Sequence, residues 1–332
     1  MERKVFAMNI LYTINDKFVP QASACMCSVC ENNKEENNIC FFVAGMGISN
    51  NNKEGLRQLA ESYGRTCKII EIDCIEKYLP FSFDTSGWNE IVLARLLIDE
   101  LLPEHIHRVI YLDGDIIVRG SLKNMWNMDM RGQTLAMSVE TTVDKKRKHN
   151  LGLDNYYYYN AGVMLINLDK WRENECGRRI LEYYEEQNGM LFANDQDAIN
   201  AVLKDEIRPM LPKYNFCNTY TQYPYNVLRK LVFPMPYIDN SAFDECKKNP
   251  VIIHYLGEER PWRAGNRHKY KDDYKKYLNM TQWSDTQDED GWKLYFFFWY
   301  CFQAVFKPFP RLRYGIINRL IPVVMKIRAR KK

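Results

Sequence analysis

Two carboxylates that interrupt an apolar stretch are the residues of this sequence best suited to binding a cation. Asp113 and Asp115 flank Gly114 directly after the apolar run at residues 109–112. An unpaired carboxylate in apolar surroundings is very costly, so these two must be paired, hydrated or bound to a cation. Together they could hold one divalent ion and leave positions for phosphate oxygens, and Gly114 would let a diphosphate approach the backbone. A plain turn after an edge strand would explain the same pattern without a ligand.

A second group with suitable chemistry follows the apolar run at residues 251–253. His254 ends this run, and Arg260 follows shortly after it. A histidine nitrogen beside two carboxylates favours Mn²⁺ over Ca²⁺ or Mg²⁺, which prefer shells made of oxygen. The guanidinium of Arg260 could clamp a phosphate. Taken alone, a histidine at the end of a strand is more often a structural residue.

Residues 159–168 and 194–197 also place polar side chains beside apolar runs. In the first segment, Asn160 precedes small residues and a buried strand, which lets a ligand come close to the backbone. In the second, Asn194 and Asp195 precede an amphipathic helix. Either residue would make a good N-cap, and on the pattern alone we favour this structural role over a catalytic one.

The elements that must position these residues are strands that alternate with helices. Their spacing indicates a mostly parallel sheet covered by helices on both faces, and therefore an α/β fold. In such a sheet, ligands bind at the carboxyl ends of the strands, which is where Asp113 stands. Strands are predicted at residues 8–13, 39–44, 67–72, 109–112, 135–139, 163–167 and 251–254, and helices at residues 22–31, 53–63, 88–102 and 195–203.

The charge of the chain is unevenly distributed. The net charge is +4, but residues 307–332 hold nine Lys or Arg and no Asp or Glu, so the remainder is acidic. Before this basic tail, the aromatic stretch at residues 294–306 is shorter than the roughly 20 residues of a transmembrane helix. Aromatic, aliphatic and basic residues mixed in this way are typical of a segment that lies on an anionic membrane surface. A helix pair packed on the body is the alternative. Nucleic acid is not expected as a partner, because the basic residues are confined to a tail rich in large aliphatics.

The 10 cysteines indicate buried thiols in place of a disulfide framework. The amino terminus shows no apolar segment with a cleavage site, so a reducing, cytoplasmic location is expected. Cys25, Cys27 and Cys30 lie close together, but the sequence offers no second ligand pair at a zinc-finger distance. We expect these three on the buried face of a helix.

Taken together and in this order, the segments resemble glycosyltransferase family 8, which includes bacterial lipopolysaccharide galactosyl- and glucosyltransferases and glycogenin. The resemblance runs from about residue 8 to about residue 268. It implies a GT-A type nucleotide-diphospho-sugar transferase fold. It also implies a catalytic domain at 1–283 and a membrane-interface tail at 284–332. Within the catalytic domain, the UDP-sugar would bind at about 8–170, and residues of about 171–268 would bind the acceptor and complete the metal site. The motifs are Ala-Arg-Leu at 94–96, Tyr-Leu-Asp-x-Asp at 111–115, Asn-Ala-Gly-Val at 160–163, Ile-Asn-Leu at 166–168, Lys-Trp-Arg at 170–172, Asp-Gln-Asp at 195–197 and His-Tyr-x-Gly-x-x-x-Pro-Trp at 254–262.

The resemblance also implies a role for each matched residue. Mn²⁺, or Mg²⁺ in its place, would be held by Asp113, Asp115 and His254. The uridine would lie on Thr13, Asn15 and Lys17, the diphosphate against Gly114, Gly257 and Arg260, the donor sugar and phosphate near Arg95, and the transferred sugar among Glu140, Asn160, Asp195 and Gln196. The family usually has Asp where Asn15 stands and Lys where Arg260 stands. The amide of Asn15 still offers a donor and an acceptor to a uracil edge, and Arg260 keeps the charge with a different reach.

The activity expected from the resemblance is transfer of a hexose from UDP-glucose or UDP-galactose to a glycan or lipid-linked glycan acceptor. The enzyme would be peripheral on the inner face of the cell membrane. The family retains the anomeric configuration. Because Gln196, the residue placed near the anomeric carbon, is a poor nucleophile, we expect front-face attack by the acceptor hydroxyl, with the leaving phosphate accepting its proton.

Two other classes of protein are weighed against this expectation. A sugar nucleotidyltransferase would carry a Gly-rich, basic loop after its first strand, and residues 13–17 do not form one. A catalytically inactive, membrane-associated protein that binds nucleotide sugars or glycans would be expected to have lost a metal ligand. All three predicted ligands are present.

Overall fold

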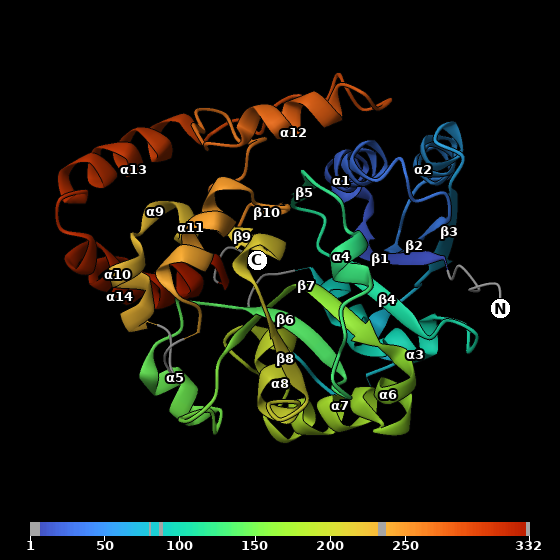
Figure 1. The fold of residues 1–332 in the computed structure, drawn as a ribbon, viewed down its shortest axis with the longest axis horizontal. Helices are drawn as coiled ribbons and strands as arrows, with labels where there is room; N and C mark the ends of the chain where they lie inside the picture. Colours follow the sequence, from blue (N-terminus) through green and yellow to red (C-terminus); the bar gives the residue numbers. More distant parts are fainter. Residues whose placement is uncertain (1–6, 80, 86–88, 232–236, 330–332) are drawn as a thin grey trace.

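A computed structural model describes residues 7–79, 81–85, 89–231 and 237–329 of the protein. A seven-stranded sheet lies at the centre of the fold (Figure 1). The strand order is β3-β2-β1-β4-β7-β6-β8. β7 is antiparallel to both of its neighbours, and the other pairs in the sheet are parallel. The prediction of a mostly parallel α/β sheet is therefore confirmed. The strands are β1 (Met8–Asn15), β2 (Ile39–Met46), β3 (Thr66–Glu71), β4 (Arg108–Leu112), β6 (Leu135–Val139), β7 (Tyr159–Asn167) and β8 (Ile207–Met210).

A second, three-stranded sheet brings a late segment of the chain to the end of β4. Its order is β5 (Ile116–Val118), β10 (Ile252–His254) and β9 (Phe216–Cys217), with β10 antiparallel to β5 and parallel to β9. The predicted strand at 251–254 corresponds to β10. The strands β5, β8 and β9 were not predicted; they have three, four and two residues, respectively, and show no readable alternation.

Helices cover both faces of the central sheet because its strands are apolar on both sides. In β1, Ile10 and Tyr12 pack into one core and Leu11 into the other. Figure 1 shows α1 (Val19–Asn32) and α2 (Asn50–Ser62) over the first face. The second face is covered by η3 (Glu90–Leu97), α3 (Ile98–Leu101), α6 (Leu168–Glu173), α7 (Cys176–Glu186) and α8 (Asn194–Val202). The remaining elements are α4 (Lys123–Trp126), α5 (Lys145–Asn150), α9 (Asn218–Gln222), α10 (Tyr225–Leu231), α11 (Asn240–Lys248), α12 (Lys271–Leu278), η1 (Asp16–Phe18), η2 (Ile75–Lys77) and η4 (Pro212–Tyr214).

The helix predicted at 88–102 differs in its winding. The described part is the 3₁₀ helix η3 followed by the short α3, and Trp88 lies outside the described residues. Six of the eight residues of η3 are buried, among them Arg95. The η3 helix is therefore surrounded by packed side chains on nearly all sides, whereas the pattern predicted a helix with a single buried face.

The ten cysteines are free thiols, and seven of them are buried. Cys25, Cys27 and Cys30 lie on α1 inside the core, so the prediction of a buried helix face is confirmed. Burial raises the pKa of Cys25 and of Cys30 to about 12, which keeps both thiols protonated.

The tail forms α13 (Lys293–Phe306) and α14 (Pro310–Ala329), and α14 returns to the body (Figure 1). Arg313 is buried against Tyr223, donates a hydrogen bond to Gln303 on α13 at 2.7 Å, and donates another to the backbone carbonyl of Gln222. The stretch at 284–290 is also anchored, since Glu289 pairs with Arg263. Within the described part of the chain, no helix has the length and apolar character that crossing a membrane requires.

Candidate active site

The direction of β7 brings its first residues beside the carboxyl end of β4. Because the two strands are antiparallel, Leu112 pairs with Val163, and the backbone N–H of Asp113 donates to the carbonyl of Gly162 at 2.8 Å. β10 lies antiparallel to β5 and places His254 opposite Ile116. Three segments far apart in the sequence therefore meet at one edge of the sheet, as the position of Asp113 predicted.

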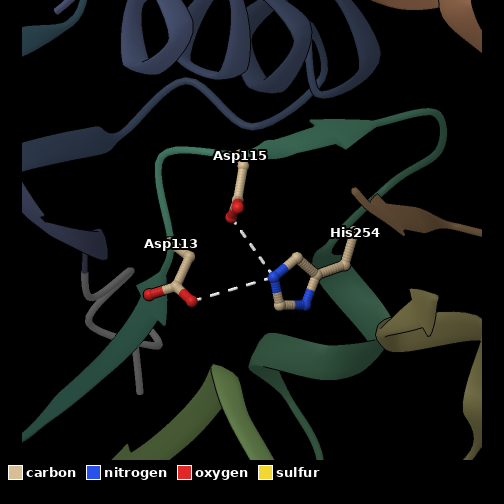
Figure 2. A group of neighbouring side chains, drawn as sticks. All are labelled: Asp113, Asp115 and His254. Carbon is tan, nitrogen blue, oxygen red and sulfur yellow. Dashed lines mark ion pairs between the residues drawn. The ribbon is translucent and has the colours of Figure 1, made fainter. Parts of the chain in front are cut away.

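Asp113, Asp115 and His254 form a group that could hold a metal ion (Figure 2). The Nε2 atom of His254 lies 3.7 Å from Oδ2 of Asp113 and 3.2 Å from Oδ1 of Asp115. One ligand atom from each residue can be chosen so that all lie within 4.8 Å of one another. His254 and Asp115 are buried, and Asp113 is a quarter exposed, so the group is open on one side. A nitrogen and two carboxylate oxygens with an open side fit a transition-metal ion such as Mn²⁺ that must also accept phosphate oxygens.

The electrostatics of this group favour a positive charge between the carboxylates. Burial alone would raise the pKa of Asp115, but the hydrogen bond and the charge of His254 outweigh this effect and lower the pKa to about 2. Asp115 is therefore ionised at neutral pH. Burial lowers the pKa of His254, whereas its bond to Asp115 and the charges of both aspartates raise it above the usual value. The lowered pKa of Asp115 and the raised pKa of His254 are both what attraction between a cation and the carboxylates produces.

Gly162 provides the space in which His254 and Asp113 can approach each other. A Cβ at position 162 would lie 2.2 Å from Cε1 of His254 and 2.8 Å from Oδ2 of Asp113. The sequence placed Gly162 in a motif of small residues but gave it no role at the metal group. Only the pairing of β7 with β4 shows that this glycine faces the predicted ligands.

Arg95 links the metal group to the predicted sugar residues. The buried guanidinium donates to Asp113 Oδ1 at 3.0 Å and to the carbonyl of Ala161 at 3.1 Å, and its Nε lies 2.7 Å from Asp195 Oδ2. Tyr111 lies under it, with the ring centroid 4.9 Å away, and its hydroxyl donates to Asp113 Oδ1 at 2.8 Å. Burial alone would lower the pKa of Arg95, and the two aspartates raise it. This side chain is therefore a fixed cation beside the metal group.

The predicted N-cap role of Asn194 or Asp195 is wrong. Ala193 occupies the cap position of α8 and makes no side-chain cap bond, and the carboxylate of Asp197 accepts from its backbone N–H at 2.9 Å. Asn194 lies at φ 44° as the first residue of α8. Asp195 is directed to Arg95, because a buried carboxylate is stabilised far more by a guanidinium than by a helix terminus.

Asp195 is expected to set the acidic side of the pH profile. Burial raises its pKa to about 6, against the opposing effect of Arg95, and the charges of Asp113 and Asp197 add to the rise. Ionised Asp195 is needed to hold Arg95, so kcat/KM at saturating Mn²⁺ should fall as the pH drops through about 6. Since the folded protein holds this proton more tightly than the unfolded chain, Asp195 lowers the free energy of unfolding as the pH rises from about 4 to 6. In the Asp195→Asn variant, the pH profile of the residual activity should no longer show an inflection near pH 6. An unchanged inflection in that variant would assign it to another group.

The other predicted sugar residues lie together, and their amides are fixed. The Oε1 atom of Gln196 accepts from the backbone N–H of Ala161 at 2.9 Å, and its Nε2 donates to the hydroxyl of Tyr158 at 3.0 Å. Asn160 donates through Nδ2 to Glu140 at 3.2 Å. The side-chain amides of Asn160 and Gln196 are therefore held in defined orientations at this edge of the sheet.

The predicted uridine residues differ in what they offer. Thr13 is buried and bonded to the hydroxyl of Tyr111 at 2.9 Å, and Lys17 is exposed. Asn15 carries a buried Oδ1 atom that has no hydrogen-bond partner among the described residues. An acceptor left buried without a partner is costly, so this oxygen fits a ligand that brings its own donor, as the N3–H of uracil does.

The predicted diphosphate residues lie around Asp115. Arg260 donates to Asp115 Oδ2 at 3.2 Å, so its cation lies next to the metal group. Gly257 has a φ of 70° with open space around the position of a Cβ, so backbone conformation requires the glycine. Glu259, between them in the chain, accepts hydrogen bonds from Asn218 at 3.3 Å and from the side chain of Gln222. These bonds attach the Arg260 loop to α9.

The fold and this arrangement of residues define a sugar-transferring enzyme of the GT-A type. The sequence profile of glycosyl transferase family 8 matches residues 9–265, and the chain belongs to this family. The crystal structure of the galactosyltransferase LgtC with donor and acceptor sugar analogs is similar in fold. Its TM-score is 0.70 at 23% identity, and the match covers 86% of this chain and 99% of that one. The expected fold is thereby confirmed.

Curated relatives cover most of the chain. General stress protein A of Bacillus subtilis is 26% identical over 285 residues, which are 85% of this chain and 96% of that protein. A lipopolysaccharide 1,2-glucosyltransferase of Escherichia coli is 25% identical over 85% of this chain and 80% of its own length. The lipopolysaccharide 1,3-galactosyltransferase of Salmonella typhimurium is 24% identical over 83% and 79%, respectively.

Proposed function

We propose that the protein is a Mn²⁺-dependent, retaining hexosyltransferase. It would transfer glucose or galactose from a UDP-sugar to a cell-surface glycan, such as a lipopolysaccharide core or a lipid-linked oligosaccharide. Membership of the family supports sugar transfer, and the names of the glucosyl- and galactosyltransferase relatives support the hexose and the acceptor class. The observation that carries the proposal is the Asp113, Asp115 and His254 group at the sheet edge. Asn15 ends the neighbouring strand β1, and its buried Oδ1, which has no hydrogen-bond partner among the described residues, supports a uracil as the base.

The residues at this edge of the sheet would have different roles in sugar transfer. Bound Mn²⁺ would supply positive charge for the leaving diphosphate, and the guanidinium of Arg260 would bind the same group. Asp195 would orient the sugar hydroxyls from its position on Arg95. Because both ends of the Gln196 amide are already bonded, this side chain is suited to position the sugar and not to attack it. This supports front-face attack by the acceptor hydroxyl, with its proton passing to the leaving phosphate oxygen.

The donor and the metal dependence are tested together by measuring UDP release from a panel of UDP-sugars, with Mn²⁺ and with a chelator. We expect release from UDP-glucose or UDP-galactose that the chelator abolishes. Binding of Mn²⁺ and UDP without release would favour an inactive nucleotide-sugar-binding protein. Failure to bind any UDP-sugar would overturn the proposal, and the Asn15 and Arg260 departures would then mark a changed nucleotide.

The tail supports a peripheral position on the inner face of the cell membrane. Nine of the thirteen large apolar side chains that are exposed among the described residues lie on α13, on α14 or between them. A groove of about 470 Å³ beside α13 is lined by Arg267 and Lys293 together with Phe297 and Tyr300, which suits an anionic lipid surface. Within the described part of the tail, the exposed large apolar residues are Leu294, Tyr295, Phe297, Phe298, Val305, Phe309, Leu312, Leu320 and Val323.

The double variant Phe297→Ser, Phe298→Ser is expected to bind anionic phospholipid vesicles at least about tenfold more weakly, because two exposed aromatic rings no longer enter the interface. Hydrolysis of the UDP-sugar in solution should not change, since both rings are more than half exposed. Vesicle sedimentation measures the effect. A matched control replaces Met190 and Leu211, which are exposed on the body, by Ser. Equal sedimentation of the tail variant and the control would rule out the proposed role of the tail.

A further inference from the structure

Asn215 was not predicted as a site residue, but it lies between the predicted metal ligand His254 and the predicted sugar residue Asn160. It precedes β9 and is 2% exposed. Its Oδ1 lies 2.9 Å from Nδ1 of His254, and its Nδ2 donates to Oδ1 of Asn160 at 2.8 Å. It is therefore bonded to both groups of residues through one buried amide.

The direction of every bond in this network follows from one backbone donor. The N–H of Gly162 can only donate, and it lies 3.0 Å from Oδ1 of Asn160. Asn160 must therefore direct its Nδ2 to Glu140, and Asn215 must direct its own Nδ2 to Oδ1 of Asn160. The opposite orientation of either amide would place two donors or two acceptors face to face.

The Oδ1 of Asn215 must then be an acceptor for His254. The Nδ1 atom of His254 consequently carries the proton, and in the neutral ring the lone pair is on Nε2. Nε2 is the atom that faces Asp113 and Asp115. The backbone of β7 thus selects the histidine tautomer that can bind a metal, through Asn160 and Asn215.

We propose that Asn215 is a positioning residue that fixes the metal-binding tautomer of His254 and at the same time orients Asn160 toward the donor sugar. The proposal rests on the proposed metal-dependent function. Partners of this kind, beyond the direct ligands, typically change metal affinity or activity by about 10- to 100-fold. Asn215 therefore joins metal binding to sugar recognition in one set of bonds.

Two substitutions separate the two bonds of Asn215. Asn215→Leu removes both, and Mn²⁺ titration followed by electron paramagnetic resonance, without nucleotide, should show affinity weakened by about 10-fold or more. Asn215→Asp keeps an acceptor for His254 but loses the donor to Asn160. It should retain Mn²⁺ affinity and UDP affinity, while kcat for transfer falls by about 10-fold.

The matched control is Asn33→Leu. Asn33 is also 2% exposed, and its side chain makes two hydrogen bonds, to the carbonyl of Val29 and from the N–H of Leu122, neither of which involves a residue of the metal group. It should lower the Tm as Asn215→Leu does, with Mn²⁺ affinity unchanged. Folded Asn215→Leu with wild-type Mn²⁺ affinity would overturn the positioning role alone. Absence of Mn²⁺ binding by the wild-type protein would overturn the metal assignment, and the role of Asn215 with it.

Discussion

Asp113→Asn and Asp115→Asn are each expected to lower the transfer rate by on the order of 10³-fold, because each removes a charged ligand from the proposed metal group. Asp113 also anchors Arg95 at 3.0 Å, so its loss disturbs the sugar side as well. The backbone bond from Asp113 to Gly162 does not involve the side chain, and the strand pairing should persist. UDP release at saturating Mn²⁺ measures the effect, and circular dichroism checks the fold.

Asp273→Asn is the matched control for these two variants. Asp273 also pairs with an arginine, since its Oδ2 lies 3.0 Å from Nε of Arg119, but it lies outside the metal group. Its substitution should change stability by about 1 kcal/mol at most and leave transfer unaffected. Full activity of both variants, Asp113→Asn and Asp115→Asn, would remove the metal assignment.

Gly162→Ala is expected to weaken Mn²⁺ binding and to reduce transfer by about 10²-fold, although alanine adds a single methyl group. The added Cβ would lie 2.2 Å from Cε1 of His254 and 2.8 Å from Oδ2 of Asp113, so the ring and the carboxylate must shift from their present positions. The ring cannot move freely, because its Nδ1 is bonded to Asn215. Misplacement of a catalytic group by about 1 Å is enough for losses of this size, and overpacking costs about 1–3 kcal/mol of stability.

Gly120→Ala is a suitable comparison for Gly162→Ala. A Cβ at Gly120 would lie 3.8 Å from the side chain of Val251, which is ordinary contact, and its backbone is not left-handed. Mn²⁺ affinity measured for both variants should therefore separate a local clash from a general effect of replacing glycine. If Gly162→Ala binds Mn²⁺ as the wild type does, His254 is not held where the structure places it, or it is not a ligand.

The sequence predicted which segments form most of the strands of the sheet, but it did not predict how the strands pair or which residues this pairing brings together. The apolar runs that became β1, β2 and β4 are buried on both faces, and such runs are readable without knowledge of their partners. The antiparallel direction of β7 depends on pairing across more than 40 residues and has no local signal. The role of Gly162 follows from that pairing, so it could not be derived from its motif.

The local pattern favoured Asn194 or Asp195 as a helix cap, and only the family resemblance placed Asp195 near the transferred sugar. The partner of Asp195 is not visible in that pattern. In the structure its partner is Arg95, which lies on η3 and is brought close only when both elements pack on the same face of the sheet. Asn215 was missed for a similar reason. A single asparagine before a two-residue strand resembles any loop asparagine, and its importance comes from His254 and Asn160, each about 40 residues or more away in the chain.

Gln222 receives a bond from the tail and gives one to the loop of Arg260. Its carbonyl accepts from Arg313 on α14, and its side chain donates to Glu259, the neighbour of Arg260. If α14 lies on a bilayer as proposed, a change in its position would reach Arg260, the proposed diphosphate residue, through two residues, Gln222 and Glu259. For the proposed peripheral enzyme acting on a lipid-linked acceptor, we expect the kinetics of a reaction confined to two dimensions. The mole fraction of acceptor within the bilayer would then set turnover, and its bulk concentration would not.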